Sequence, residues 1–122
     1  MDVSFGELLR QKRRGIGISQ RRLAELAGLD FSYISKLENS RLAAPAAETV
    51  LRLADLLGCP PEELLSAAGK LPGDVGQNLS SSPAAVRFMR EASALGLTTD
   101  EWEKMRGMLL GLREDEDGRT QQ

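Results

Sequence analysis

Short polar side chains recur along one side of a predicted helix between Phe31 and Glu38. A helix turns by 100° per residue, which puts Ile34 and Leu37 together on the other side. The polar side carries Ser32, Ser35, Lys36 and Asn39. Such side chains can exchange hydrogen bonds with base edges in the major groove of DNA, and lysine also reaches phosphates. We therefore predict that these four residues contact bases.

Further residues flank this helix where DNA phosphates would lie. The predicted phosphate contacts are Ser19, Gln20, Arg21 and Arg41. Phe31 stands at the flank of the first turn, where its ring either meets a thymine methyl group or packs inward, and we favour base contact. A polar face alone is ordinary on a surface helix, so it is the joint pattern that indicates DNA binding.

Two helices joined by a sharp turn would place these side chains, and the sequence has the spacing of such a pair. Counted from Gln20 as the first position, the fifth, ninth, fifteenth and eighteenth residues are Ala24, Gly28, Ile34 and Leu37. A residue larger than Ala24 would overpack the helix crossing, and Gly28 allows the positive φ of the turn. Ile34 and Leu37 fill the space between the helices.

Helix start and stop signals divide residues 1–69 into five short predicted helices. Ser4 and Glu7 have capping-box spacing, and Ser19 and Asp30 can cap the second and third helices. The helices are expected over 5–14, over 20–27, from Asp30 to near Glu38, in ETVLRLADLLG closing on Gly58, and in PPEELLSAAG closing on Gly69. The fold class is all-α.

The composition changes after residue 69. Residues 70–82, KLPGDVGQNLSSS, predict a linker with room for one short turn. Ser82 and Pro83 then open a helix that ends before Gly96, and a second helix begins with a capping box at Thr98 and Glu101. We predict an antiparallel two-helix hairpin over 83–113 and a frayed, disordered tail over 114–122.

Such a hairpin cannot cover both sides of its apolar stripe, so it needs a partner surface. That surface is either the N-terminal domain or the same hairpin of a second chain. The flexible linker favours the second chain, which would give a four-helix bundle. The residues expected at this dimer interface are Val86, Met89, Trp102, Met105, Leu109 and Leu112.

The net charge of −2 over 122 residues is divided unevenly along the chain. Residues 1–41 carry a balance of +3 and the remainder carries −5, which fits a DNA-reading module followed by a part with another role. The chain has no histidine, its one thiol (Cys59) lies beside Pro60, and it has no Gly-rich phosphate loop. We expect no enzyme activity, no cofactor and no metal.

One cysteine cannot form an intramolecular disulfide, and the sequence has no signal peptide and no apolar run of membrane-spanning length. These features predict a cytoplasmic protein without membrane contact.

The stretch GISQRRLAELAGLDFSYISKLENSRLAAPAAETVLRLADLLG resembles the Cro/C1-type, or Xre, helix-turn-helix family of phage and bacterial regulators, over about residues 5–68. The resemblance implies a five-helix, lambda-repressor-like domain that binds operator DNA as a dimer, usually as a repressor. It also implies that Arg13 of the first helix pairs with Glu38. Two positions depart from the family: Ser40 replaces a loop glycine, and Ala46 replaces a polar cap.

The second unit, AVRFMREASALGLTTDEWEKMRGMLLGLRE, is similar in layout to the C-terminal hairpin of SinR-type repressors. In those proteins an Xre domain is followed by a linker and a two-helix oligomerisation unit that an antagonist protein can invade. The resemblance implies a homodimer or higher oligomer on double-stranded operator DNA, and a protein antagonist that acts on the hairpin.

We therefore predict a sequence-specific transcription regulator, a dimeric repressor that reads a two-fold symmetric operator with its third helix in the major groove. The alternative is the antitoxin of a toxin–antitoxin pair, which holds a partner protein and binds DNA only for autoregulation. An adjacent toxin gene would favour that alternative. An activator that controls a restriction system is a further variant, but such controllers usually lack so long a C-terminal unit.

Overall fold

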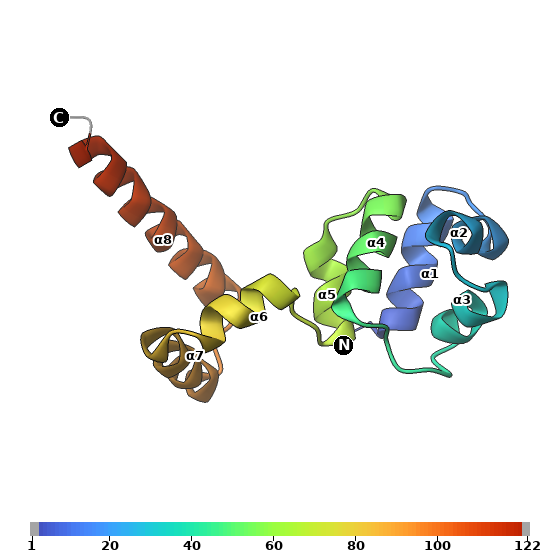
Figure 1. Cartoon of the computed structure of the whole chain (residues 1–122), viewed down its shortest axis with the longest axis horizontal. Helices are drawn as coiled ribbons and strands as arrows, with labels where there is room; N and C mark the ends of the chain where they lie inside the picture. The colour runs from blue at the N-terminus through green and yellow to red at the C-terminus, as the bar shows by residue number, and fades with distance from the viewer. Residues whose placement is uncertain (1–2, 121–122) are drawn as a thin grey trace. The chain divides into compact units, whose positions relative to one another are not determined.

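The computed structural model describes residues 3–120, with side chains described for residues 3–116. Every regular element in this part of the chain is an α-helix, which confirms the all-α fold (Figure 1). The helices are α1 (Phe5–Gly15), α2 (Gln20–Ala27), α3 (Phe31–Glu38), α4 (Ala47–Leu57), α5 (Pro61–Ala68), α6 (Gly73–Ser80), α7 (Pro83–Leu95) and α8 (Thr99–Thr120). The chain divides into two compact units between Gln77 and Asn78.

Most helix ends of the first unit follow local capping chemistry. Ser4 Oγ accepts a hydrogen bond from the backbone N–H three residues on at 3.2 Å, and Ser19 Oγ does the same at 3.0 Å. Gly28 ends α2 in the left-handed conformation, with φ of 70°. Asp30 differs from the prediction, because it occupies the N-cap position of α3 but its side chain makes no capping hydrogen bond.

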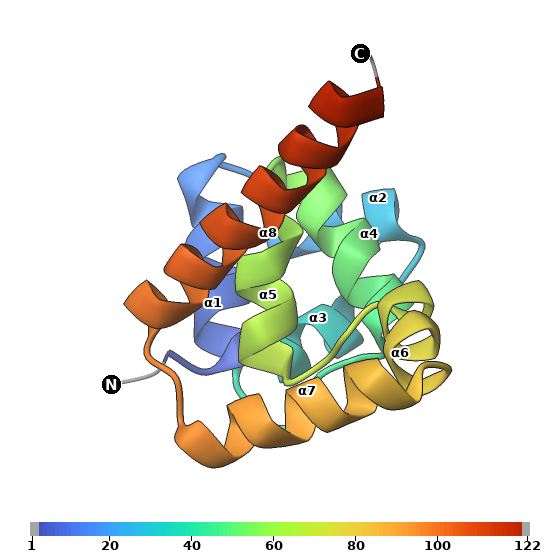
Figure 2. The same cartoon turned by 90° about the vertical axis from the view of Figure 1, so that its left-hand side faces the viewer.

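One apolar core lies beneath the five helices of the first unit. Helix α1 contacts α3 and α5, α2 contacts α3 and α4, and α4 runs beside α5 (Figure 2). The buried core residues are Phe5, Leu9, Leu23, Ala24, Ala27, Ile34, Leu37, Val50, Leu53, Ala54, Leu57, Leu64 and Leu65. Burying one Leu or Ile side chain is worth roughly 1.5–3 kcal/mol, so this cluster is what holds α3 in place.

The predicted linker contains a helix that the sequence pattern did not indicate. Helix α6 covers Gly73–Ser80, within the segment 70–82. Pro72 precedes its first turn and accepts a hydrogen bond from the N–H of Gly76 at 3.1 Å, and Asp74 lies near the positive helix end. None of its residues is buried, so the polar composition indicated exposure correctly but did not preclude a helix.

The second unit differs from the predicted antiparallel hairpin in two respects. Helices α7 and α8 diverge from the turn between them as an open V, instead of lying side by side (Figures 1 and 2). Helix α8 also continues to Thr120, so residues 114–120 are helical, contrary to the predicted disordered tail, whose last two residues lie outside the described part. Glu and Arg are good helix formers, and Arg113 pairs with Glu116 at 3.5 Å one turn later.

No helix in the described part of the chain is both long and apolar enough to cross a membrane.

Candidate nucleic-acid interface

Helices α2 and α3 contact each other across a sharp turn at Gly28. The N–H of Leu29 donates to the carbonyl of Ala24 at 2.9 Å and closes the turn. Ala24, Ile34 and Leu37 are all buried where the two helices meet the core. This packing fixes which side of α3 faces solvent.

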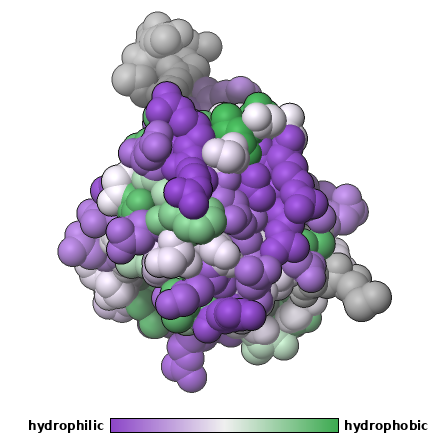
Figure 3. Space-filling model, turned by 90° about the vertical axis from the view of Figure 1, so that its right-hand side faces the viewer, coloured by the Kyte–Doolittle hydropathy of each residue, from purple (hydrophilic) through white to green (hydrophobic). Residues whose placement is uncertain are grey.

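The solvent side of α3 presents the predicted base-contact residues. Ser32, Lys36 and Asn39 are exposed, and Ser35 is half-buried. Hydrophilic side chains predominate on this side of the molecule (Figure 3). The face can therefore offer several hydrogen-bond donors and acceptors to a ligand without any rearrangement of the core.

Glu38, the last residue of α3, is a buried carboxylate held by donors from α1 and α2. Arg13 Nε donates to Oε2 at 2.6 Å and Arg13 Nη2 donates to Oε1 at 2.9 Å, which is the pair that the family resemblance implied. Gln20 Nε2 donates to Oε1 at 3.0 Å, and Arg10 Nε lies 3.5 Å from the same oxygen. The Glu38 side chain is 0% exposed, so these donors replace the water that it has lost.

The environment of Glu38 acts on its pKa in two directions. Burial raises the pKa of this carboxyl, because it penalises the charged form. Hydrogen bonds from Arg13 and Gln20 and the charge of Arg13 lower the pKa, and together they outweigh the effect of burial. The net result is a lowered pKa for Glu38. The same hydrogen bond raises the pKa of Arg13. At neutral pH the pair is therefore ionised and ties α1 to the end of α3.

Two residues of this cluster revise the sequence-based picture. Gln20 was predicted to contact phosphate, but its amide group donates to Glu38 and is half-buried. Arg10 was not singled out, yet its Nη2 donates to Asn39 Oδ1 at 2.7 Å. Its spacing of three residues from Arg13 places both arginines on one side of α1, and this was the signal available in the sequence.

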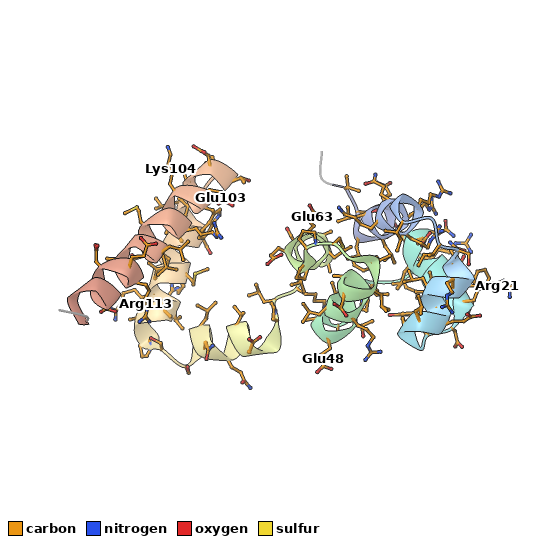
Figure 4. The ribbon with its side chains drawn as sticks, turned by 90° about the horizontal axis from the view of Figure 1, so that it is seen from above. Arg21, Glu48, Glu63, Glu103, Lys104 and Arg113 are labelled. Atoms are coloured by element: carbon orange, nitrogen blue, oxygen red, sulfur yellow. The ribbon has the colours of Figure 1, made fainter. Side chains whose placement is uncertain are left out.

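Phe31 and Arg21 form a contact between the starts of α3 and α2. The guanidinium carbon of Arg21 lies 4.7 Å from the centre of the Phe31 ring, and the ring is 41% exposed. The ring therefore neither packs fully inward nor stands free. Arg21 extends outward at the end of the first unit, where a phosphate could meet it (Figure 4).

The loop after α3 has an unusual backbone at the position where the family has glycine. Ser40 has φ of 57°, and it is the non-glycine residue with positive φ in the described part of the chain. The N–H of Arg41 donates to the carbonyl of Lys36 at 2.9 Å, which folds the loop back and keeps Arg41 beside the end of α3. Ala46 begins α4 without a side-chain cap.

Helix α1 touches this loop at Gly6, another residue that the sequence pattern did not single out. A Cβ added at Gly6 would collide with the carbonyl oxygen of Leu37 and would lie 3.0 Å from the carbonyl oxygen of Glu38 and from Ser40 Oγ. Only glycine allows α1 to pass so close to the backbone that ends α3.

The predicted dimerisation residues of the second unit leave much apolar surface uncovered. Trp102 is 41% exposed and Leu112 is 66% exposed. Val86 and Leu109 are also exposed, whereas Met89 and Met105 are half-buried. The open angle between α7 and α8 contains a mainly apolar hollow of about 310 Å³, lined by Phe88, Trp102, Met105, Arg106 and Leu109.

No group of three or more His, Cys, Asp or Glu residues within the described residues is placed to hold a metal ion. Burial raises the pKa of the Cys59 thiol, which opposes formation of the reactive thiolate.

In a comparison with known proteins, residues 9–64 match the model of a sequence family described as Helix-turn-helix. Two curated relatives come from Bacillus subtilis (strain 168). The uncharacterized HTH-type transcriptional regulator RghRB is 37% identical over 55% of this chain and 48% of its own length. The HTH-type transcriptional repressor RghR is 36% identical over 54% of this chain and 49% of its own length. The chain thus spans about half the length of the curated relatives it matches.

Among solved structures, the N-terminal DNA-binding domain of SinR from Bacillus subtilis is 30% identical, over 50% of this chain and 88% of that chain, with a TM-score of 0.47.

Proposed function

We propose, from the match of residues 9–64 to the helix-turn-helix family model, that the protein is a DNA-binding transcription regulator that reads an operator with α3 in the major groove. The observation that carries the proposal is the exposed polar side of α3, held rigid by Ile34, Leu37 and the buried Glu38. The relative named as a repressor supports repression as the mode of action. Such a regulator would act in the cytoplasm, and the proposal includes no catalytic step.

The proposed contacts divide into two classes. Ser32, Ser35, Lys36 and Asn39 lie where they can reach base edges. Arg21 and Arg41 stand at the flanks and would hold phosphates, and Phe31 would position Arg21 as well as approach a base. Gln20 would add little to phosphate binding while its amide group donates to Glu38.

The test of this function is a selection of random DNA duplexes by the purified protein, read out by sequencing. Enrichment of a two-fold symmetric site would support both the reading helix and a dimer. If no sequence is enriched, the assignment of α3 as the base-reading helix is wrong. The antitoxin alternative then takes its place, in which the chain mainly holds a protein partner.

Replacing Lys36 by alanine should weaken binding to the selected operator about 10-fold, because the loss of one base contact costs roughly 1–3 kcal/mol. The preference for the contacted base should also relax. Fluorescence anisotropy with operator and scrambled duplexes measures both effects. Lys70→Ala is the matched control, since Lys70 is an exposed lysine beyond the end of α5. Equal losses in the two variants would show that Lys36 contributes only charge.

We propose that a second copy of the chain covers the apolar surface of the second unit, which makes the regulator a homodimer. Within one chain, the open V leaves many large apolar side chains exposed to solvent. Symmetric pairing with a second copy would bury this apolar surface on both chains. Pairing matters for function, because Lys36 is the one cation on the base-contact side of α3, so a single copy would bind weakly. A protein antagonist could act by competing for the same surface.

Trp102→Ala should raise the dissociation constant of this dimer about 10-fold or more, since buried aromatic anchors dominate interface energies. Sedimentation over a range of concentrations measures the change. Glu103→Ala is the control, because Glu103 is the neighbouring exposed residue of α8 (Figure 4). If Trp102→Ala and the control sediment alike, Trp102 does not contribute to the interface.

A further inference from the structure

Arg10 connects α1 to the last polar residue of the predicted base-contact set. Its Nη2 donates to Asn39 Oδ1 at 2.7 Å and to the carbonyl oxygen of Glu38 at 3.3 Å. Arg10 is half-buried, and its Nε also lies 3.5 Å from the Glu38 carboxylate. The arginine is therefore held by two of its three guanidinium nitrogens, which makes it a support for the Asn39 side chain.

This contact determines how the amide group of Asn39 is oriented. A guanidinium group has five hydrogen-bond donors and no acceptor, so the amide atom that faces Arg10 must be the oxygen. The nitrogen Nδ2 occupies the other branch of the planar amide, and its N–H groups point away from Arg10. Because Asn39 is exposed, Nδ2 is available to a ligand while Oδ1 is engaged.

Two charged side chains near Asn39 are also hydrogen-bond donors. Lys36 precedes it by three residues, and the N–H of Arg41 folds back to the carbonyl of Lys36 at 2.9 Å. Both Lys36 and Arg41 are exposed, and neither side chain can accept a hydrogen bond. The charged side chains on either side of Asn39 therefore act only as donors, which suits acceptor atoms at this point of the surface.

We propose that Arg10 is a positioning residue that fixes Asn39 as a hydrogen-bond donor toward DNA. The inference rests on the proposed DNA-binding function. Its consequence is that Asn39 pairs with an acceptor, either a phosphate oxygen or guanine O6 or N7, and does not read adenine. Recognition of adenine by asparagine uses both amide atoms, and Arg10 holds the oxygen that would have to accept from adenine N6.

The test uses the full chain and the operator that the random selection yields. Asn39→Ala removes the donor and should weaken binding about 10-fold. Asn39→Asp keeps an oxygen for Arg10 but replaces the donor with a negative charge, so it should weaken binding more. Arg10→Met frees the amide and should weaken binding about 3- to 10-fold, and this loss should disappear when Arg10→Met is made in the Asn39→Ala background.

That double-mutant cycle separates positioning from a merely structural role, because a structural loss would persist without Asn39. Arg14→Met is the control for loss of an exposed cation from the same helix. If Arg10→Met does not fold, Arg10→Lys takes its place in the cycle, because it keeps a charge beside Glu38. Its single ammonium group does not reproduce the fork geometry of arginine, so the loss of binding that depends on Asn39 should remain. Far-UV circular dichroism checks the fold of each variant.

Two further measurements distinguish the source of the acceptor. If Asn39 contacts guanine, Asn39→Ala loses its preference at one base pair of each half-site, and Arg10→Met gains tolerance for adenine there. If Asn39 contacts a phosphate, each variant loses affinity by the same factor on all DNA sequences. The inference is overturned if Arg10→Met lowers affinity equally with and without Asn39, or if Asn39→Asp binds as the wild type does. A wild type that selects no operator would instead refute the proposed function itself.

Discussion

Replacing Glu38 by alanine is expected to destabilise the first unit by about 3–5 kcal/mol, more than any other single substitution proposed for this chain. The reason is that Arg13 would remain buried without its carboxylate, and the Gln20 amide would lose its acceptor. Urea unfolding followed by far-UV circular dichroism measures the loss. Trp102 fluorescence reports the second unit separately, because the one tryptophan of the chain lies there.

Two variants test whether the buried pair is the cause. Glu25→Ala removes an exposed partner of Arg22 and should change stability by less than about 1 kcal/mol. The double variant Arg13→Met with Glu38→Leu replaces both charges by apolar side chains and should regain part of the loss. A Glu38→Ala variant as stable as the Glu25→Ala variant would mean that the pair is energetically neutral.

The same carboxylate gives the first unit a component of acid sensitivity. The pKa of Glu38 is lowered in the folded state, so its contribution is fully present above the unfolded-state pKa, roughly 4.3, and is lost as the pH falls through the folded-state value. Glu38→Gln cannot ionise and should therefore flatten the loss of stability below about pH 4. Unfolding curves recorded across this range for both proteins provide the comparison.

Gly6→Ala should destabilise the first unit by roughly 1–3 kcal/mol, although alanine is the better helix former. The new methyl group would meet the carbonyl oxygen of Leu37, and that oxygen belongs to the backbone that ends α3. Because the collision pushes on the loop that carries Asn39 and Arg41, operator affinity should fall together with stability. Thermal unfolding and anisotropy on the selected operator measure the two effects.

Gly15→Ala is the matched control for this variant, since Gly15 lies in the same helix and a Cβ there would meet nothing within 4 Å. Its expected effect is neutral, or stabilising by up to about 1 kcal/mol. If Gly6→Ala proves as stable as Gly15→Ala, then α1 does not approach α3 as closely as the structure has it.

Local patterns in the sequence were sufficient to predict the helices of the first unit. Ser4, Ser19 and Gly28 act through hydrogen bonds and backbone angles within a few residues, so a short stretch of chain contains all the information they need. The apolar spacing of Ile34 and Leu37 likewise indicated which side of α3 would face the core. For the same reason the polar side of α3 could be recognised from residue spacing alone.

The predictions that failed concern segments whose conformation burial does not decide. Helix α6 and the end of α8 are exposed, so composition indicated a linker and a frayed tail. Good helix formers such as Glu and Arg favour the end of α8. Helix α6 is rich in Gly, Asp and Asn, and its start is supported by the hydrogen bond from Gly76 to the carbonyl of Pro72. The open V of α7 and α8 departs from the predicted hairpin. Apolar spacing indicates that one face of a helix must be covered, but it does not identify the surface that covers it.

Residue spacing was therefore enough to identify the helix-turn-helix, its buried side and its polar side, because each depends on a single helix or turn. Three contacts became known from the folded chain alone: Gln20 donates to Glu38, Arg10 donates to Asn39, and α1 approaches α3 at Gly6. These contacts join residues far apart in the chain, and no local periodicity encodes a hydrogen-bond partner on another helix. A polar side chain forms its hydrogen bonds with whichever group the packing of the core brings within reach.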